Sequence, residues 1–214
     1  MTPFQFFTKL DQTLLLGRHA RNATELLDGI RQVPQSSIYH HTHRFLQRHH
    51  YLSPEPPNDF AYWVTAMLND DVLGEQLASV DVVQFQTITE LRETFQGILE
   101  EYVQKTEKLR DCARGEEFQF MATRTFVLST ALTAHSLPEF REILGTLSVK
   151  SLYYHMFDAR LRLGRGENDF SRWFRDLGYA DLAAAVSRLD PYNYTLEGLR
   201  AHILDTVETY ASDR

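Results

Sequence analysis

The chain has 214 residues, a formal net charge of −7 at pH 7, 43% apolar residues and 12% aromatic residues. This composition is typical of a folded globular protein, and an acidic isoelectric point near 5.7 disfavours nucleic-acid binding, which needs a basic surface. One cysteine, no signal-peptide pattern and no membrane-length apolar run predict a cytoplasmic protein with no nucleic-acid or membrane partner.

The first predicted element lies at Phe4-Gln5-Phe6, where apolar and polar residues alternate. The same three residues recur 114 residues later, at Phe118-Gln119-Phe120. Alternation of this kind is typical of a half-buried strand. A short strand pair formed by these two segments is therefore the alternative to the all-α fold that the rest of the chain predicts.

Helical periodicity follows each of these segments. Apolar residues at three-four spacing predict one helix near residues 26–33 and another near residues 140–147. A capping residue stands three positions before a glutamate at the start of each helix, with Asn22 before Glu25 and Ser136 before Glu139. Both segments are therefore expected to be N-capped helices.

A segment rich in tyrosine and histidine comes next, and it also recurs. Ser37-Ile38-Tyr39-His40-His41 corresponds to Ser151-Leu152-Tyr153-Tyr154-His155 at the same spacing. On a helix, His41 and His155 both fall on the apolar face. A histidine in that position needs hydrogen-bond partners for its ring nitrogens. A pair of core histidines is the simpler interpretation, and a functional pair is the alternative.

The third recurring motif is Asn58-Asp59-Phe60 followed by Trp63, which matches Asn168-Asp169-Phe170 followed by Trp173. An asparagine or aspartate at a helix start caps free amide groups and contributes about 0.5–2 kcal/mol. The aromatic residues then form one apolar stripe. Capping and core packing explain the motif without catalysis, although an aspartate beside a tryptophan also suits a catalytic acid.

Long helices predicted over residues 88–103 and 196–211 close the two copies. The pattern predicts an all-α protein made of two tandem copies: a first helical repeat at 1–103, a charged linker at 104–117 and a second helical repeat at 118–214. Related copies tend to pack about a pseudo-twofold axis. The sequence leaves open whether each copy folds alone.

A catalytic interpretation uses the polar residues of these motifs. In an acid–base hydrolase, a histidine would transfer a proton while a nearby tyrosine orients the substrate. The candidate catalytic residues are Tyr39, His41, Asp59, Tyr153, His155 and Asp169. No nucleophile motif or glycine-rich phosphate loop accompanies them.

A metal-assisted hydrolase would take its ligands from His40, His41 and His43, or from His41 and His155 brought together, with Asp59 or Asp169 as the oxygen ligand. The spacing supports this weakly, because adjacent His40 and His41 diverge on a helix and Phe157 replaces His43 in the second copy. We therefore expect no metal and no cofactor.

Arginines after the tyrosine-histidine segments are candidates for binding a small anion. Arg44 and Arg48 follow the first segment, and Arg160 and Arg162 follow the second. The guanidinium group binds phosphate and carboxylate groups through two parallel hydrogen bonds. Surface arginines that pair with the protein's own carboxylates are, however, the commoner arrangement.

Two motifs carry a resemblance to a known family: Ser37 to His43, which reads SIYHHTH, and Pro57 to Val64, which reads PNDFAYWV. They resemble an uncharacterised prokaryotic family with a domain-of-unknown-function label, over essentially the whole chain. The family pattern has two tyrosines before the histidine, so His40 departs from it. The resemblance implies a prokaryotic cytoplasmic protein and assigns no function.

We interpret the chain as a non-catalytic binding or regulatory module for a protein partner, a second copy of itself or a small anionic metabolite. The alternative is a metal-assisted or acid–base hydrolase that uses the recurring Tyr, His and Asp residues. The two hypotheses differ in one respect. An enzyme needs its histidines in an open cleft beside a carboxylate, whereas a binding module can bury them.

Overall fold

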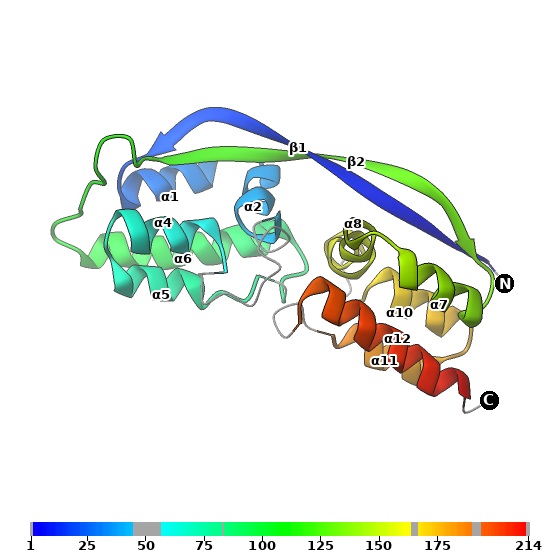
Figure 1. The fold of residues 1–214 in the computed structure, drawn as a ribbon. Coiled ribbons are helices and arrows are strands. Elements are labelled where there is room, and N and C mark those ends of the chain that lie inside the picture. The colour runs from blue at the N-terminus through cyan, green and yellow to red at the C-terminus, as the bar shows by residue number, and fades with distance from the viewer. Residues whose placement is uncertain (1, 45–56, 83, 164–166, 190–193, 213–214) are drawn as a thin grey trace. The chain divides into compact units, whose positions relative to one another are not determined.

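The computed structural model describes the chain except for residues 1, 45–56, 83, 164–166, 190–193 and 213–214 (Figure 1). Its strands are β1 (Phe4–Ala20) and β2 (Phe118–Ala134). Its helices are α1 (Ala23–Gln32), α2 (Gln35–His41), α4 (Asp59–Met67), α5 (Asp71–Ala78), α6 (Ile88–Lys105), α7 (Leu137–Thr146), α8 (Val149–Tyr153), the π-helix η1 (Tyr154–Asp158), α9 (Ala159–Leu163), α10 (Asp169–Asp176), α11 (Ala180–Ser187) and α12 (Leu196–Ser212).

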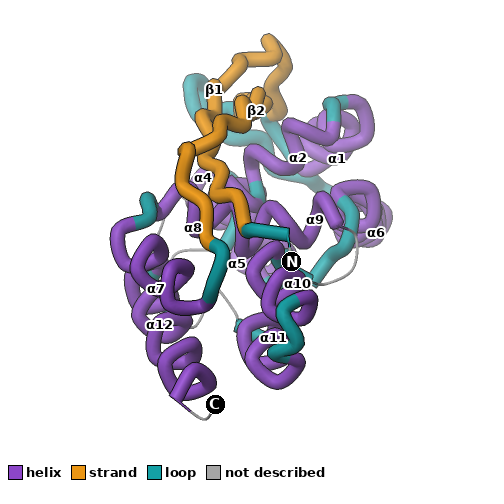
Figure 2. The backbone as a smooth tube through the Cα atoms, turned by 90° about the vertical axis from the view of Figure 1, so that its right-hand side faces the viewer, coloured by secondary structure: helices purple, strands orange, loops and turns teal. Residues whose placement is uncertain are grey.

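The prediction of an all-α fold is wrong. β1 and β2 contain 17 residues each and pair as a two-stranded antiparallel sheet, visible as two neighbouring orange tubes in Figure 2. The alternative, a mainly helical protein with a strand pair, is the one that the structure supports. Exposed apolar residues such as Leu15 and Phe126 interrupt the expected alternation. The strand signal in the sequence was therefore strong only at the start of each strand.

Contacts divide the chain into two compact units. Unit 1 comprises chiefly Met1–Leu10 and Thr125–Arg214, and unit 2 comprises chiefly Asp11–His49 and Ser53–Arg124. The start of β1 thus belongs to the unit that contains α7 to α12, while the start of β2 belongs to the unit that contains α1 to α6. Each unit therefore takes the first part of a strand from the other half of the sequence.

Unit 1 has an aromatic core built around the first residues of β1. Phe4 and Phe6 point from the strand into the helices and are buried. The ring of Phe6 lies 5.6 Å from that of Phe140 in α7, and the ring of Phe4 lies 5.4 Å from that of Phe170 in α10. The alternation at Phe4-Gln5-Phe6 thus places two phenylalanines on the covered face of the strand, as the pattern predicts.

Unit 2 repeats this arrangement with the first residues of β2. Phe118 packs 5.4 Å from Phe60 in α4, and Phe120 is completely buried against α1. A Cβ atom at Gly29 of α1 would lie 2.1 Å from the Phe120 ring. Only a glycine lets the helix approach the strand this closely.

Side-chain caps begin several helices where the sequence predicts them. Asn22 and Ser136 accept hydrogen bonds from the backbone amide groups of α1 and α7, as predicted. Thr87 caps α6 in the same way. The cap of α1 also carries an ion pair, because the Arg21 guanidinium lies 2.8 Å from Glu25. This hydrogen-bonded arginine lowers the pKa of the Glu25 carboxyl.

Among the described residues, none of the helices combines the length and the apolar character needed to span a bilayer.

Candidate functional site

The recurring histidine of unit 2 is buried and uses both of its ring nitrogens inside the protein. His41 lies at the end of α2, and its side chain is 1% exposed. Its Nδ1 lies 2.7 Å from Oδ2 of Asp59, and its Nε2 accepts a hydrogen bond of 3.0 Å from the backbone N–H of Met121 in β2. A ring nitrogen that accepts from an amide carries no proton, so the ring proton sits on Nδ1 and is donated to the carboxylate.

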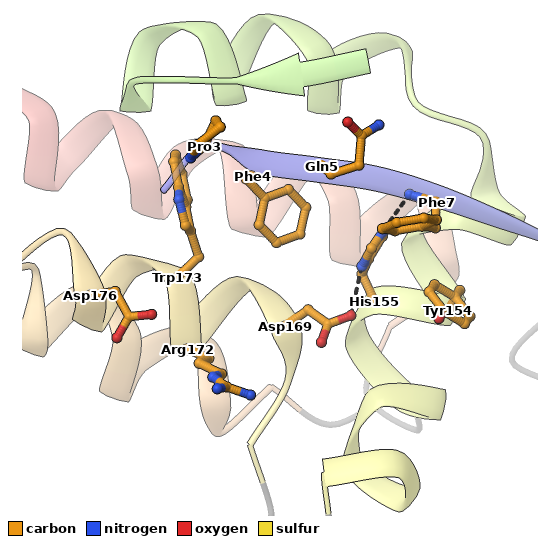
Figure 3. A pocket seen from close by; sticks show the side chains of 10 residues that line it. All are labelled: Pro3, Phe4, Gln5, Phe7, Tyr154, His155, Asp169, Arg172, Trp173 and Asp176. Carbon is orange, nitrogen blue, oxygen red and sulfur yellow. Dashed lines mark hydrogen bonds and ion pairs between the residues drawn. The ribbon is translucent and has the colours of Figure 1, made fainter. Parts of the chain in front are cut away.

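The recurring histidine of unit 1 has the same partners. Nδ1 of His155 lies 2.7 Å from Oδ2 of Asp169, and its Nε2 accepts a hydrogen bond of 2.8 Å from the backbone N–H of Phe7 in β1 (Figure 3). We call each hydrogen-bonded series of an aspartate, a histidine and a strand amide a clasp. The unit 1 clasp is Asp169, His155 and the amide of Phe7, and the unit 2 clasp is Asp59, His41 and the amide of Met121.

Helix caps place the aspartates of the two clasps. Asn58 caps α4 through the amide of Ala61, and Asn168 caps α10 through the amide of Ser171. Asp59 and Asp169 are therefore the first residues of their helices, where the helix dipole favours a negative charge. The predicted capping role of this motif is confirmed for its asparagines, and each aspartate holds a histidine in addition.

Aromatic rings enclose both histidines. His155 lies in the π-helix η1 and stacks on Phe170, with ring centroids 5.4 Å apart. His41 lies 4.7 Å from Phe118. The rings keep both imidazoles almost completely buried, which strengthens their hydrogen bonds and raises the cost of leaving one of them unmade.

The other residues considered as metal ligands have local partners. His43 is 3% exposed, its Nδ1 lies 3.1 Å from the hydroxyl of Thr42, and its ring stacks on Tyr39. His41 and His155 belong to different units. Within the part of the chain that the structure describes, no three histidine, cysteine, aspartate or glutamate residues are grouped to hold a metal ion.

The tyrosine of the unit 1 motif borders a buried ion pair that the sequence did not reveal. Tyr153 is 3% exposed, and Nζ of Lys9 lies 4.9 Å from the centre of its ring. The same ammonium group lies 2.5 Å from Oδ2 of Asp158. The Lys9 side chain is 1% exposed, so β1 places a buried cation between a carboxylate and an aromatic ring.

The candidate anion-binding arginines that are described bind the protein itself. Arg44 lies 3.5 Å from a carboxylate oxygen of Asp11, and Arg160 donates to the backbone carbonyls of Ser187 and Leu189 at 2.7 and 3.0 Å. Arg48 lies outside the described residues. Arg162 lies in α9, but its side chain is also outside the described part.

An open pocket of 420 Å³ lies beside the unit 1 clasp (Figure 3). One side of α10 supplies four lining residues at helical spacing, and the start of β1 and η1 supply the others. The lining residues are Pro3, Phe4, Gln5, Phe7, Tyr154, His155, Asp169, Arg172, Trp173 and Asp176. Sequence reasoning found His155 and Asp169 but missed Arg172 and Asp176. Their spacing from Asp169 was the available signal, and many surface helices share it.

The chain belongs to a family that matches residues 1–208 and is described as a family of unknown function (DUF5752). Among solved structures, the structure of OrfY from Thermoproteus tenax is similar, with 33% sequence identity and a TM-score of 0.83. The match covers 99% of this chain and 96% of that chain. No curated protein matches. The resemblance to an uncharacterised family is thus confirmed, and neither match names an activity.

Proposed function

We propose that the chain is a non-catalytic binding module and that the open pocket of unit 1 is its ligand site. The observation that carries the proposal is the geometry of the two clasps. A general base needs a lone pair that faces the substrate. In His41 and in His155, the Nε2 lone pair instead faces the amide group of a strand residue.

The clasps also give the recurring residues a structural purpose. Each clasp connects the start of a helix to the start of a strand. The histidine and the amide that it binds are 80 residues apart in the sequence in unit 2 and 148 residues apart in unit 1. Holding a strand in this way requires a buried histidine with two partners, which is the arrangement described. The recurrence of Asp59 with His41 and of Asp169 with His155 therefore needs no reaction to explain it.

The pocket favours binding because it is open and has both apolar and charged walls. Ligand pockets commonly have volumes of about 300–1,000 Å³, mostly apolar walls and a few charged groups. The pocket of unit 1 falls within this range of volumes and places aromatic residues beside Asp169, Arg172 and Asp176. Its occupant would be a small molecule or a side chain of a protein partner. A cytoplasmic location remains part of the proposal.

The two tryptophans allow a direct test, because Trp173 lines the pocket and Trp63 belongs to unit 2. In a Trp63→Phe variant, fluorescence reports on the pocket alone, and in a Trp173→Phe variant it reports on unit 2. We would titrate both with agmatine, succinate and inorganic phosphate. We expect a saturable change for at least one probe in the Trp63→Phe variant and none in the Trp173→Phe variant.

Calorimetric titration of the unaltered chain with the same probes guards against an effect of either substitution on folding. Binding of none of the probes, by fluorescence and by calorimetry, would contradict the proposed function.

A further inference from the structure

We infer that the pocket of unit 1 binds its ligand through a positively charged nitrogen, an alkyl ammonium or guanidinium group. This inference rests on the proposed function, because it names the ligand class of the same pocket. Charge, aromatic walls and an internal example of the same recognition in unit 1 support it.

Among the lining residues that the structure describes, the charged side chains are two carboxylates and one guanidinium. Asp169 and Asp176 supply carboxylates, and Arg172 lies between them on α10. The Asp169 side chain is 16% exposed, and the bond from Nδ1 of His155 fixes the position of its carboxylate. A carboxylate that is fixed and partly removed from water attracts a cation more strongly than a freely solvated one.

Asp176 is the part of the pocket that is open to an incoming group. It is exposed, and it makes no hydrogen bond or ion pair with the residues that the structure describes. Arg172 is likewise exposed and makes no such contact with described residues. A cation can therefore approach Asp176 without displacing an internal partner, whereas an anion at Arg172 would lie between two carboxylates.

Aromatic rings form the remaining walls. Phe4, Phe7, Tyr154 and Trp173 line the pocket, and Phe7 remains partly exposed. A cation within about 6 Å of an aromatic ring centre is attracted by the electrons of the ring face. The pocket thus combines the two kinds of group that bind organic cations, a carboxylate and an aromatic ring.

The same unit already binds one of its own cations in this way. Nζ of Lys9 lies 2.5 Å from the Asp158 carboxylate and 4.9 Å from the centre of the Tyr153 ring. Tyr154, the next residue, lines the pocket together with Asp169. The π-helix that starts at Tyr154 therefore supplies both the carboxylate that binds Lys9 and an aromatic residue of the pocket wall.

The test compares cationic and anionic probes on charge variants of the pocket. Agmatine and N-acetylargininamide present a guanidinium on a free small molecule and on a peptide-like group, and succinate and inorganic phosphate are the anions. Asp176→Asn removes a carboxylate from the pocket, and Arg172→Gln removes its cation. Asp181→Asn is the matched control, because it removes an exposed carboxylate of unit 1 that does not line the pocket.

We expect calorimetry to show one site for a cationic probe. Its affinity should fall about threefold to fivefold in Asp176→Asn, rise by a similar factor in Arg172→Gln and stay unchanged in Asp181→Asn. The affinity should also fall with added salt, because these charges are partly exposed. Binding of agmatine alone assigns the site to a free small molecule, and binding of N-acetylargininamide alone assigns it to a side chain of a partner.

Two results would overturn the inference. In the first, succinate or phosphate binds, Arg172→Gln weakens that binding, and neither cation binds. The ligand would then be an anion, and the proposed binding function would still hold. Binding of a cation with equal affinity in Asp176→Asn and in Asp181→Asn would place that cation outside this pocket.

Discussion

Unit 1 and unit 2 hold their strands with the same groups. In each, an aspartate at a helix start, a buried histidine and a strand amide form the clasp, at nearly equal distances. A tryptophan then adds a further bond: Trp63 donates to the carbonyl of Glu116, and Trp173 donates to the carbonyl of Thr2. Each acceptor stands two residues before the first residue of its strand. The shared features therefore attach the strands to the helices.

The units differ in the residues that lie next to the clasp. Unit 1 has Tyr154, Arg172 and Asp176 in its pocket lining. At the matching positions of the sequence, unit 2 has His40, Tyr62 and Ala66. His40 is buried with its Nδ1 2.8 Å from the hydroxyl of Thr123, and Ala66 carries no charge. What the units share supports the fold, and what separates them lies at the proposed ligand site of unit 1.

Breaking each clasp gives the largest expected effect. In His155→Leu, the amide of Phe7 and the carboxylate of Asp169 each lose the hydrogen bond to the imidazole, at an expected cost of about 2–4 kcal/mol in the free energy of unfolding. His41→Leu should cost less, because the Asp59 side chain is 27% exposed and that of Asp169 is 16% exposed. Urea unfolding of each variant, followed by tryptophan fluorescence, measures the loss.

The conservative variants sharpen this test. A glutamine in place of either histidine retains a donor and an acceptor on one planar group, so the loss should be smaller than for leucine. Equal losses for glutamine and leucine would argue that the clasps contribute through packing rather than through their hydrogen bonds. An unchanged stability of His155→Leu would contradict a structural role for the clasp.

Local features of the clasps could be predicted from the sequence. The caps at Asn58 and Asn168 follow from residues within one helical turn, and the burial of His41 and His155 follows from helical periodicity. The amides that bind these histidines could not be predicted, because they lie in strands from the opposite half of the sequence. Such distant partners leave no periodic signal. The origin of the two halves by duplication stays a prediction.

The full length of the strands and the pocket could not be predicted from the sequence, for related reasons. Beyond their first residues, β1 and β2 have exposed apolar side chains, so the period-two pattern is lost. On α10, Arg172 and Asp176 look like ordinary surface residues until Phe4 and Tyr154 are placed opposite them. In both cases the decisive neighbour is supplied by tertiary structure.

A second contrast between the units lies in how closely a helix approaches its strand. Gly29→Ala in unit 2 should cost about 1–3 kcal/mol, because the new Cβ would meet the Phe120 ring at 2.1 Å inside a packed core. In unit 1 the matching position is Ile143, so the close approach belongs to unit 2 alone. Thermal unfolding measures the loss.

Gly97→Ala is the matched control for this substitution. Gly97 is an exposed glycine inside α6 of the same unit, and a Cβ there meets nothing within 4 Å. Since alanine favours the helix over glycine, this variant should gain up to about 1 kcal/mol. A loss in Gly29→Ala no greater than the change in Gly97→Ala would show that the Phe120 contact adjusts without cost.

The smallest expected effect concerns a backbone position that the two strands share. Gly17 in β1 has a φ of +67°, and Ala131, which stands 114 residues later in β2, has a φ of +61°. A side chain in this left-handed region costs about 1–2 kcal/mol, part of which is offset by the lower entropy of the unfolded chain. The backbone of unit 1 is therefore strained at Ala131, whereas Gly17 adopts the same conformation in unit 2 without that strain.

Exchanging the two residues should change stability in opposite directions. Ala131→Gly is expected to raise the free energy of unfolding by up to about 1 kcal/mol, and Gly17→Ala is expected to lower it by about 1 kcal/mol. Nothing lies within 4 Å of a Cβ at Gly17, so its loss comes from the backbone and not from a clash. Ala201→Gly, at an exposed helical position of α12, is the control and should only destabilise. A loss in Ala131→Gly as large as in Ala201→Gly would mean that the left-handed turn of β2 is held by its neighbours without strain at the alanine itself.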